Sequence, residues 1–240
     1  MVNPPNDSAR TVVATGTHGA LKAVRAEWRT REILDATARL MARDGFEGVS
    51  MQALADEASV SVGLIYRYFS GKQELLEAVI VDVLDAFEER VPVAIATCAG
   101  DPIEAIAAAF GAYCTVIDEH RQAALLSYRE SKSLTREGLV RIKALEIQTS
   151  EPLRHVIREG ASLGLLIDVD AEILAYNFLL LAHGWALKHW YFERKLDLDA
   201  YIACQCAFAL RSVLHPNYLG KYRHLIELAT KPQPDATTSL

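Results

Sequence analysis

The chain has 240 residues, 51% of them hydrophobic and 23% charged, and a formal net charge of −6. This balance is typical of a folded globular protein and excludes a chain that is disordered throughout. The clearest apolar stretch, residues 105–117, is shorter than the roughly 20 residues of a membrane-spanning helix, so we expect no membrane partner. The N-terminus lacks the apolar region of a secretory signal, and the four scattered cysteines suit a reducing compartment. We therefore expect a cytoplasmic protein.

Charge is distributed unevenly along the chain. Residues 1–75 contain 9 Lys and Arg against 9 Asp and Glu, so the acidic excess lies in the remainder. Four basic side chains near the N-terminus face one acidic side chain within ten positions; they are Lys22, Arg25, Arg29 and Arg31 against Glu27. Residues 1–25 show no apolar period and are predicted to form a disordered basic arm. Such an arm is compatible with docking on phosphate, and also with a solvated tail.

Helical periodicity begins near Ala26, and the first helix is expected to stop at Gly45. Two helices of about two turns follow, 51–58 and 62–69, each preceded by a serine that can cap it. The turn between them is very short, and Ala55 is small where the two helices would cross. This pattern is typical of a helix-turn-helix, whose second helix enters the DNA major groove, although an ordinary helical hairpin shares it.

A longer helix is predicted from residue 72, with Ser70 and Gln73 as its capping box and Pro92 at its end. Further helices are predicted at 102–118, 121–132, 136–163, 170–193 and 198–214, with a short piece at 217–229. Pro152 should kink or break the helix that contains it. No alternating β pattern appears, so we expect an all-α fold. Its domains would be a three-helix module over 26–76, a helical bundle over 77–230 and a disordered tail over 231–240.

Two blocks of sequence resemble the TetR family of bacterial repressors. The first block comprises Arg31-Glu32-Ile33-Leu34-Asp35-Ala36, Asp44-Gly45-Phe46 and Ser50-Met51-Gln52-Ala53-Leu54-Ala55. The second comprises Val62-Gly63-Leu64-Ile65-Tyr66-Arg67-Tyr68-Phe69 and Ser70-Gly71-Lys72-Gln73-Glu74-Leu75-Leu76. The similarity includes the spacing between the blocks. It implies a homodimeric DNA-binding regulator whose last two long helices, here 170–193 and 198–214, form the dimer interface.

The helix-turn-helix offers ten candidate residues for binding double-stranded DNA. Helix N-termini attract phosphate. We therefore expect two phosphate contacts, one on each side of the recognition helix: the first at Ser50 and Met51, the second at Lys72. Gly63 permits close approach to DNA, and Arg67 can make a bidentate contact with guanine or bind a phosphate. The remaining candidates are Ser61, Val62, Leu64, Tyr66 and Tyr68, while Ile65 and Phe69 are expected in the core of the module. A dimer would bind two half-sites, so the expected operator is palindromic.

Residues that can line an effector pocket gather in the C-terminal part of the chain. The aromatic candidates are Phe110, Tyr113, Tyr128, Phe178 and Trp185, each of which can equally be a core residue. Residues 185–191 resemble a Trp/basic/Trp-Tyr segment of some TetR-type regulators of fatty-acid and steroid breakdown that respond to CoA thioesters. That resemblance implies that Lys188 and His189 bind phosphates, with Arg129 as a further basic candidate. The alternatives are a dimer interface with solvated charges and a non-CoA, drug-like effector.

Nothing in the sequence nominates a catalytic or metal site. Cys204 and Cys206 lack the spacing of zinc ligands, and no phosphate-binding loop or hydrolase motif occurs. We therefore expect no enzyme and no cofactor. The predicted function is that of a transcriptional repressor, released from its operator by a small apolar or acyl-CoA-type effector. The alternative is an all-helical binding protein or enzyme that does not bind DNA.

Overall fold

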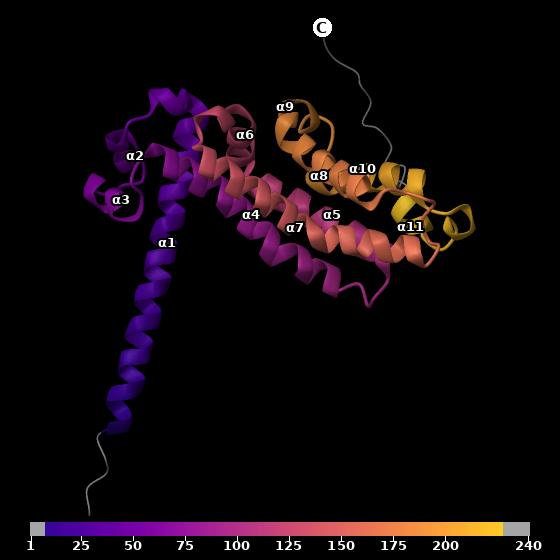
Figure 1. The fold of residues 1–240 in the computed structure, drawn as a ribbon, viewed down its shortest axis with the longest axis horizontal. Helices are drawn as coiled ribbons and strands as arrows, with labels where there is room; N and C mark the ends of the chain where they lie inside the picture. The colour runs from indigo at the N-terminus through magenta and orange to yellow at the C-terminus, as the bar shows by residue number, and fades with distance from the viewer. Residues whose placement is uncertain (1–7, 228–240) are drawn as a thin grey trace, which may run out of the picture. The chain divides into compact units, whose positions relative to one another are not determined.

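The computed structural model describes residues 8–227, with side chains from Trp28 onward (Figure 1). The chain divides into two compact units, residues 1–79 with 130–135, and residues 80–129 with 136–240. All regular secondary structure in the described residues is helical, apart from one isolated β-bridge between Leu166 and Leu214. The predicted all-α fold is confirmed.

The first unit contains α1 (Ser8–Gly48), α2 (Met51–Glu57), α3 (Val62–Tyr68) and the first turns of α4 (Lys72–Ala96). Helix α1 begins at Ser8, whereas the sequence predicted a start near residue 26. Residues 8–25 contain no proline and several Ala, Lys and Arg residues, which favour a helix even without an amphipathic period. The rest of the predicted arm and the predicted tail at 231–240 lie outside the described residues.

Backbone conformation and burial explain how these helices meet. Gly45 has φ 75° and ψ 162°, so it interrupts the helical geometry of α1 where a glycine stop was predicted. The fully buried side chains of this unit come from each of its four helices; they include Ile33, Met41, Leu54, Ile65 and Leu75. The three-helix module and the start of α4 therefore share one core. Burial of each such side chain contributes about 1.5–3 kcal/mol to the free energy of unfolding.

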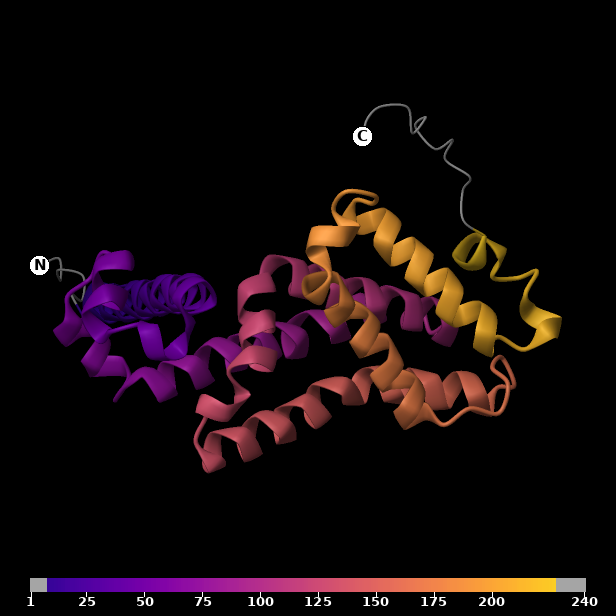
Figure 2. The same ribbon diagram turned by 90° about the horizontal axis from the view of Figure 1, so that it is seen from above.

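The second unit is a bundle around α5 (Pro102–Glu119), whose two neighbours in sequence are α4 and α6 (Arg121–Arg129). Helix α5 packs against α7 (Arg136–Ser162), α8 (Ala171–Leu187) and α10 (Leu198–Val213), which can be followed in Figure 2. The bundle is completed by three short pieces. These are α9 (His189–Phe192), a 3₁₀ turn at Pro216–Tyr218 and α11 (Arg223–Ile226).

Both prolines lie inside helices that continue past them, so the predicted end at Pro92 was wrong and Pro152 does not break the helix expected over 136–163. Pro92 lies within α4 on an exposed face. Proline has no N–H to bond the main-chain carbonyl four residues earlier, but on this face water can bond that carbonyl instead. Pro152 lies within α7, where side chains donate to carbonyls of the preceding turn. The Tyr113 hydroxyl donates to the Thr149 carbonyl at 2.8 Å, and the Arg154 guanidinium donates to the Ile147 carbonyl. These bonds tie the turn before Pro152 to α5 and to the next turn of α7.

The helix predicted over 170–193 is divided at Lys188 into α8 and α9. Lys188 has φ −122° and ψ 25°, which is not helical. Within residues 8–227, no helix combines the length and the apolar character needed to cross a membrane.

Candidate nucleic-acid interface

Serine N-caps fix where α2 and α3 begin. The Ser50 side chain accepts the Ala53 N–H at 3.1 Å, and the Ser61 side chain accepts the Leu64 N–H at 3.2 Å. Each bond satisfies an N–H that the first turn of a helix leaves without a partner. Between the helices, Ser59 adopts φ 54° and the Val60 N–H donates to the Ala55 carbonyl at 2.9 Å. The two short helices are therefore joined by a tight turn.

The two faces of α3 differ in their exposure to solvent. Ile65 is fully buried and Phe69 is buried, as the sequence predicted for the core of the module. The residues that point outward are Ser61, Gly63, Tyr66, Arg67 and Tyr68, with Tyr66 54% exposed, whereas Val62 and Leu64 are half-buried. A Cβ at Gly63 would meet no atom of the chain within 4 Å. The packing of the chain itself therefore does not require a glycine there.

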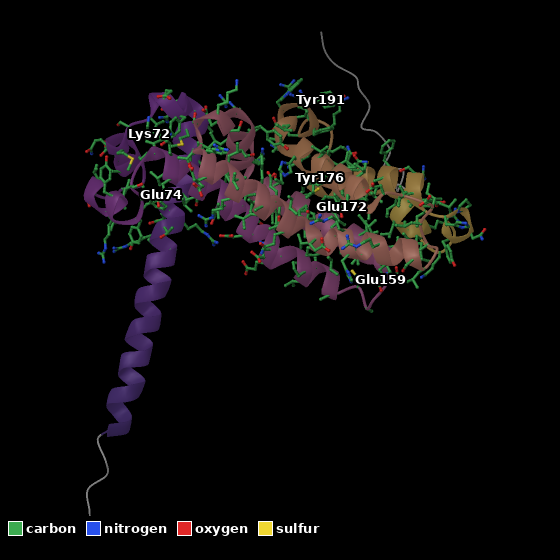
Figure 3. All side chains as sticks on the ribbon, viewed as in Figure 1. Lys72, Glu74, Glu159, Glu172, Tyr176 and Tyr191 are labelled. Carbon is green, nitrogen blue, oxygen red and sulfur yellow. The ribbon has the colours of Figure 1, made fainter. Side chains whose placement is uncertain are left out.

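Lys72 lies at the start of α4 and is half-buried (Figure 3). Its ammonium donates to the carbonyl of Phe46 at 3.0 Å and lies 4.8 Å from the centre of the Phe46 ring. Nearby, the Glu74 carboxylate accepts both the N–H and the hydroxyl of Ser70 at 2.6 Å. These hydrogen bonds lower the pKa of Glu74. The capping partner of Ser70 is thus Glu74 rather than the predicted Gln73.

Four of the aromatic residues predicted to line a pocket belong to the core of the second unit. Phe110, Tyr113, Phe178 and Trp185 are all buried, and the rings of Phe110 and Phe178 lie 5.4 Å apart. The Trp185 indole donates to the Asp118 carboxylate at 2.7 Å. Phe110, Phe178 and Trp185 therefore pack α5 and α8 together, while Tyr113 contacts Phe87 on α4 and Thr149 on α7.

The remaining predicted ligand residues lie nearer the surface. Lys188 and Arg129 are exposed, while His189 is half-buried and contacts the guanidinium of Arg121. Glu193 lies 3.2 Å from the same nitrogen of His189. Sequence reasoning did not identify Arg121, because Arg121 on α6 and His189 on α9 are 68 residues apart and meet only in the folded bundle.

Tyr128, also predicted as a ligand residue, is half-exposed and makes a contact that the sequence did not reveal. Its hydroxyl lies 2.9 Å from Nδ1 of His183 on α8. Burial lowers the pKa of His183 to about 4 and raises the pKa of Tyr128. Both groups are therefore neutral near pH 7, and the sequence separation of 55 residues explains why no local pattern pairs them.

Metal-binding groups do not gather among the described residues, where no cluster of three or more His, Cys, Asp or Glu could hold an ion. The four cysteines are free thiols. Cys206 is buried, and burial raises its pKa to about 12, so it stays protonated near neutral pH. Cys204 is half-buried.

Comparison with known proteins identifies both parts of the chain. The family model described as "Bacterial regulatory proteins, tetR family" matches residues 33–79, and "Tetracyclin repressor-like, C-terminal domain" matches residues 99–194. The HTH-type transcriptional regulator HbdR of Aromatoleum sp. (strain CIB) is 36% identical over 176 residues, which are 73% of this chain and 76% of HbdR. The chain belongs to the TetR family. It is a DNA-binding transcriptional regulator with a helix-turn-helix and not an enzyme.

Solved structures of TetR-family regulators share this fold. PfmR from Thermus thermophilus has a TM-score of 0.65 and 24% identity, covering 75% of this chain and 97% of its own. AibR, solved in complex with isovaleryl coenzyme A and operator DNA, has a TM-score of 0.62 and 24% identity, covering 72% and 94%. All ten candidate DNA-binding residues of this TetR-family chain lie within 33–79, and all candidate ligand residues lie within 99–194.

Proposed function

We propose that this TetR-family regulator is a homodimeric cytoplasmic repressor that leaves a palindromic operator when a small apolar or acyl-CoA-type effector binds. The observation that carries the proposal is the outward face of α3. Exposed hydroxyls, a guanidinium and a glycine that internal packing does not require are the groups that a helix in the major groove uses.

The groups on and beside α3 divide into two roles. Tyr66, Tyr68 and Lys72 bind phosphates, which fixes the orientation of the helix without reading sequence. Arg67 reads guanine, since a guanidinium can donate two parallel hydrogen bonds to one base edge. The serine caps fix the first turns of α2 and α3, which carry Met51, Val62 and Leu64 near the DNA. Ser50, Ser61 and Gly63 make further contacts with the DNA.

Dimerisation through α8 and α10 is supported by apolar side chains that remain exposed among the described residues. On α8 they recur at helical spacing at Ile173, Tyr176 and Leu180, of which Figure 3 labels Tyr176. On α10, Phe208 is 73% exposed. A two-fold axis would cover the same patch on both copies, as in most homodimers.

The acyl-CoA class is supported by two observations. AibR, which has the same fold, was solved with isovaleryl coenzyme A bound. In this chain the exposed Lys188 and the half-buried His189 adjoin the buried Trp185, so basic groups for phosphates lie beside apolar groups for an acyl chain. Tyr128 and Arg129, both exposed at the end of α6, would extend that surface.

The decisive experiment selects bound sequences from a random DNA pool and repeats the selection with a panel of CoA thioesters and their free acids. We expect an inverted repeat, and loss of the bound fraction with one thioester but not with its acid. Equal release by acid and thioester would favour a general apolar effector instead. Recovery of an asymmetric site, or of none, would contradict the dimeric repressor.

A further inference from the structure

The first part of α1 extends beyond the core of the helix-turn-helix unit. Helix α1 runs from Ser8 to Gly48, and within this range its helical geometry is interrupted at Gly45 alone (Figure 1). Among residues 28–48 the first buried side chain is Ile33, whereas Trp28, at the start of this range, is 62% exposed. At about 1.5 Å for each residue, residues 8–32 extend α1 by about 37 Å beyond its first buried residue. We call residues 8–32 the N-terminal extension.

This extension is basic in a chain that is acidic overall. Residues 8–31 hold five Lys or Arg and one acidic residue, Glu27, whereas the whole chain has a net charge of −6. Arg29 and Arg31 are exposed, and neither forms an ion pair with another described residue. Positive charge that the chain itself does not neutralise attracts an anionic partner.

Helical register places three of the basic residues on one face of the extension. Lys22, Arg25 and Arg29 are separated by three and four residues, which is the spacing of one stripe along a helix with about 3.6 residues per turn. Glu27 is two residues from both Arg25 and Arg29, so its position is on the opposite face. We call Lys22, Arg25 and Arg29 the basic stripe. It covers about 10 Å of the helix axis, which equals the length of about three base pairs.

Double-stranded DNA is the partner that fits the basic stripe best. A duplex presents a regular row of phosphates, with one negative charge for about every 1.7 Å of its axis. The stripe belongs to the same unit as α2 and α3, and the helix that carries it leads directly to Ser50, the N-cap of α2. A second copy of the extension would instead bring like charges together, which is unfavourable.

We propose that the N-terminal extension of α1 is a second DNA-binding surface, which binds backbone phosphates through Lys22, Arg25 and Arg29 in addition to the contacts of α3. Phosphate contacts carry no sequence information, so the surface increases affinity for any duplex. The proposal rests on DNA binding by this family member. It depends neither on a palindromic operator nor on the class of the effector.

The test compares salt dependence in the full chain and in a variant without the stripe. The neutral variant combines Lys22→Gln, Arg25→Gln and Arg29→Gln. Fluorescence anisotropy measures binding over a salt series to a duplex of arbitrary sequence and to a duplex recovered from the random pool. For each bound protomer the slope of log affinity against log salt should fall by about 2–3, because three phosphate contacts are lost. Affinity near 0.2 M salt should fall by about 10–100-fold on both duplexes.

Two controls separate the stripe from charge in general. The first control combines Arg136→Gln, Lys143→Gln and Arg194→Gln, which removes the same charge from exposed positions of the second unit and should leave the slope unchanged.

The second control keeps the composition and net charge of the extension but moves two basic residues to the opposite face. It exchanges Ala20 with Lys22 and Ala23 with Arg25, so each basic residue moves by two positions along the helix. This exchanged variant should lose about two-thirds of the slope that the neutral variant loses. Because all these positions precede the first buried residue of α1, urea unfolding of the exchanged and neutral variants should match that of the unaltered protein.

An unchanged salt slope in the neutral variant would overturn the proposal. So would an exchanged variant that binds like the unaltered protein, because the extension would then act as a cationic chain without a defined face. Vesicles of anionic lipid are the third probe, since a basic helix also suits such a surface. Vesicle binding that the neutral variant loses, with its DNA affinity unchanged, would assign the stripe to a membrane instead. The duplex of arbitrary sequence makes the test independent of whether an inverted repeat is recovered, so it is distinct from the test of the repressor.

Discussion

The ammonium of Lys72 and the main-chain carbonyl of Phe46 are hydrogen-bonded at 3.0 Å, across 26 residues of sequence. The same ammonium lies over the Phe46 ring, which is buried. A lysine ammonium has three protons, so this bond still leaves donors for a phosphate. Lys72 therefore ties the start of α4 to the end of α1 and carries its charge beside α3.

Lys72→Ala should weaken binding to every DNA sequence by a similar factor and reduce the slope of log affinity against log salt by about 1, because one phosphate contact is lost. It should also lower stability, by about 0.5–1 kcal/mol for the contact with the ring alone. Fluorescence anisotropy over a salt series and urea unfolding measure the two effects. The control is Lys132→Ala, which removes an exposed charge in the same unit. An unchanged slope in Lys72→Ala would exclude the phosphate contact.

Tyr66 and Arg67 are adjacent on α3, but their substitutions should have different effects on DNA binding. Tyr66→Phe removes a neutral hydroxyl, so affinity should fall for all sequences while the salt slope stays the same. Arg67→Ala should relax the preference at one position of each half-site, at a cost of about 1–3 kcal/mol. Selection from a random pool with each variant measures both. A uniform loss for Arg67→Ala, without a change in the selected sequence, would make Arg67 a backbone contact.

The helix-turn-helix could be predicted from the sequence because its determinants are local. The caps at Ser50 and Ser61 bond N–H groups three residues away, and Gly45 has the positive φ that its residue type allows. Burial of Ile65 and exposure of Tyr66 follow from helical periodicity within a single short helix.

Contacts between distant segments could not be predicted in this way. Tyr128 meets His183, and Glu130 meets Phe46, only after the helices have packed. The bond from the Tyr113 hydroxyl to the Thr149 carbonyl joins α5 to α7 in the same way, across 36 residues of sequence. Four of the aromatic ligand candidates are buried, and a sequence does not distinguish a core ring from one that lines a pocket.

Ser59, in the turn before α3, has φ 54°, a conformation that costs a residue with a Cβ about 1–2 kcal/mol. Ser59→Gly should relieve this cost and stabilise the protein by about 1 kcal/mol, less than the full strain because the unfolded chain regains some entropy. Urea unfolding measures the change. Ala99→Gly, at φ 49° in the second unit, is a matched substitution that should act in the same direction. A loss of stability in Ser59→Gly would mean that the serine side chain stabilises the turn.

Phe208 on α10 tests the dimer. Phe208→Arg would place a charge in the centre of the proposed interface, where it could not be hydrated, so the variant should sediment as a monomer. DNA affinity should fall with it, because two half-sites are no longer bound together. Val93→Arg is the control, because Val93 is a similarly exposed apolar residue of the second unit but lies on α4. Dimers that persist in Phe208→Arg would place the interface elsewhere.

His183 should make stability depend on pH in the acid range. Its pKa is lowered from 6.5 to about 4 by burial, so the unfolded chain takes up this proton at a higher pH than the folded chain does. The contribution of His183 to the free energy of unfolding should therefore be constant above about pH 6.5 and fall between about pH 6.5 and pH 4, by at most about 3 kcal/mol. Urea midpoints across this range should show the loss in the unaltered protein and much less of it in His183→Gln. The control is His155→Gln, at an exposed position of α7, which should retain the full pH dependence. If both variants gave the same pH profile, the loss of stability in acid would not come from protonation of His183.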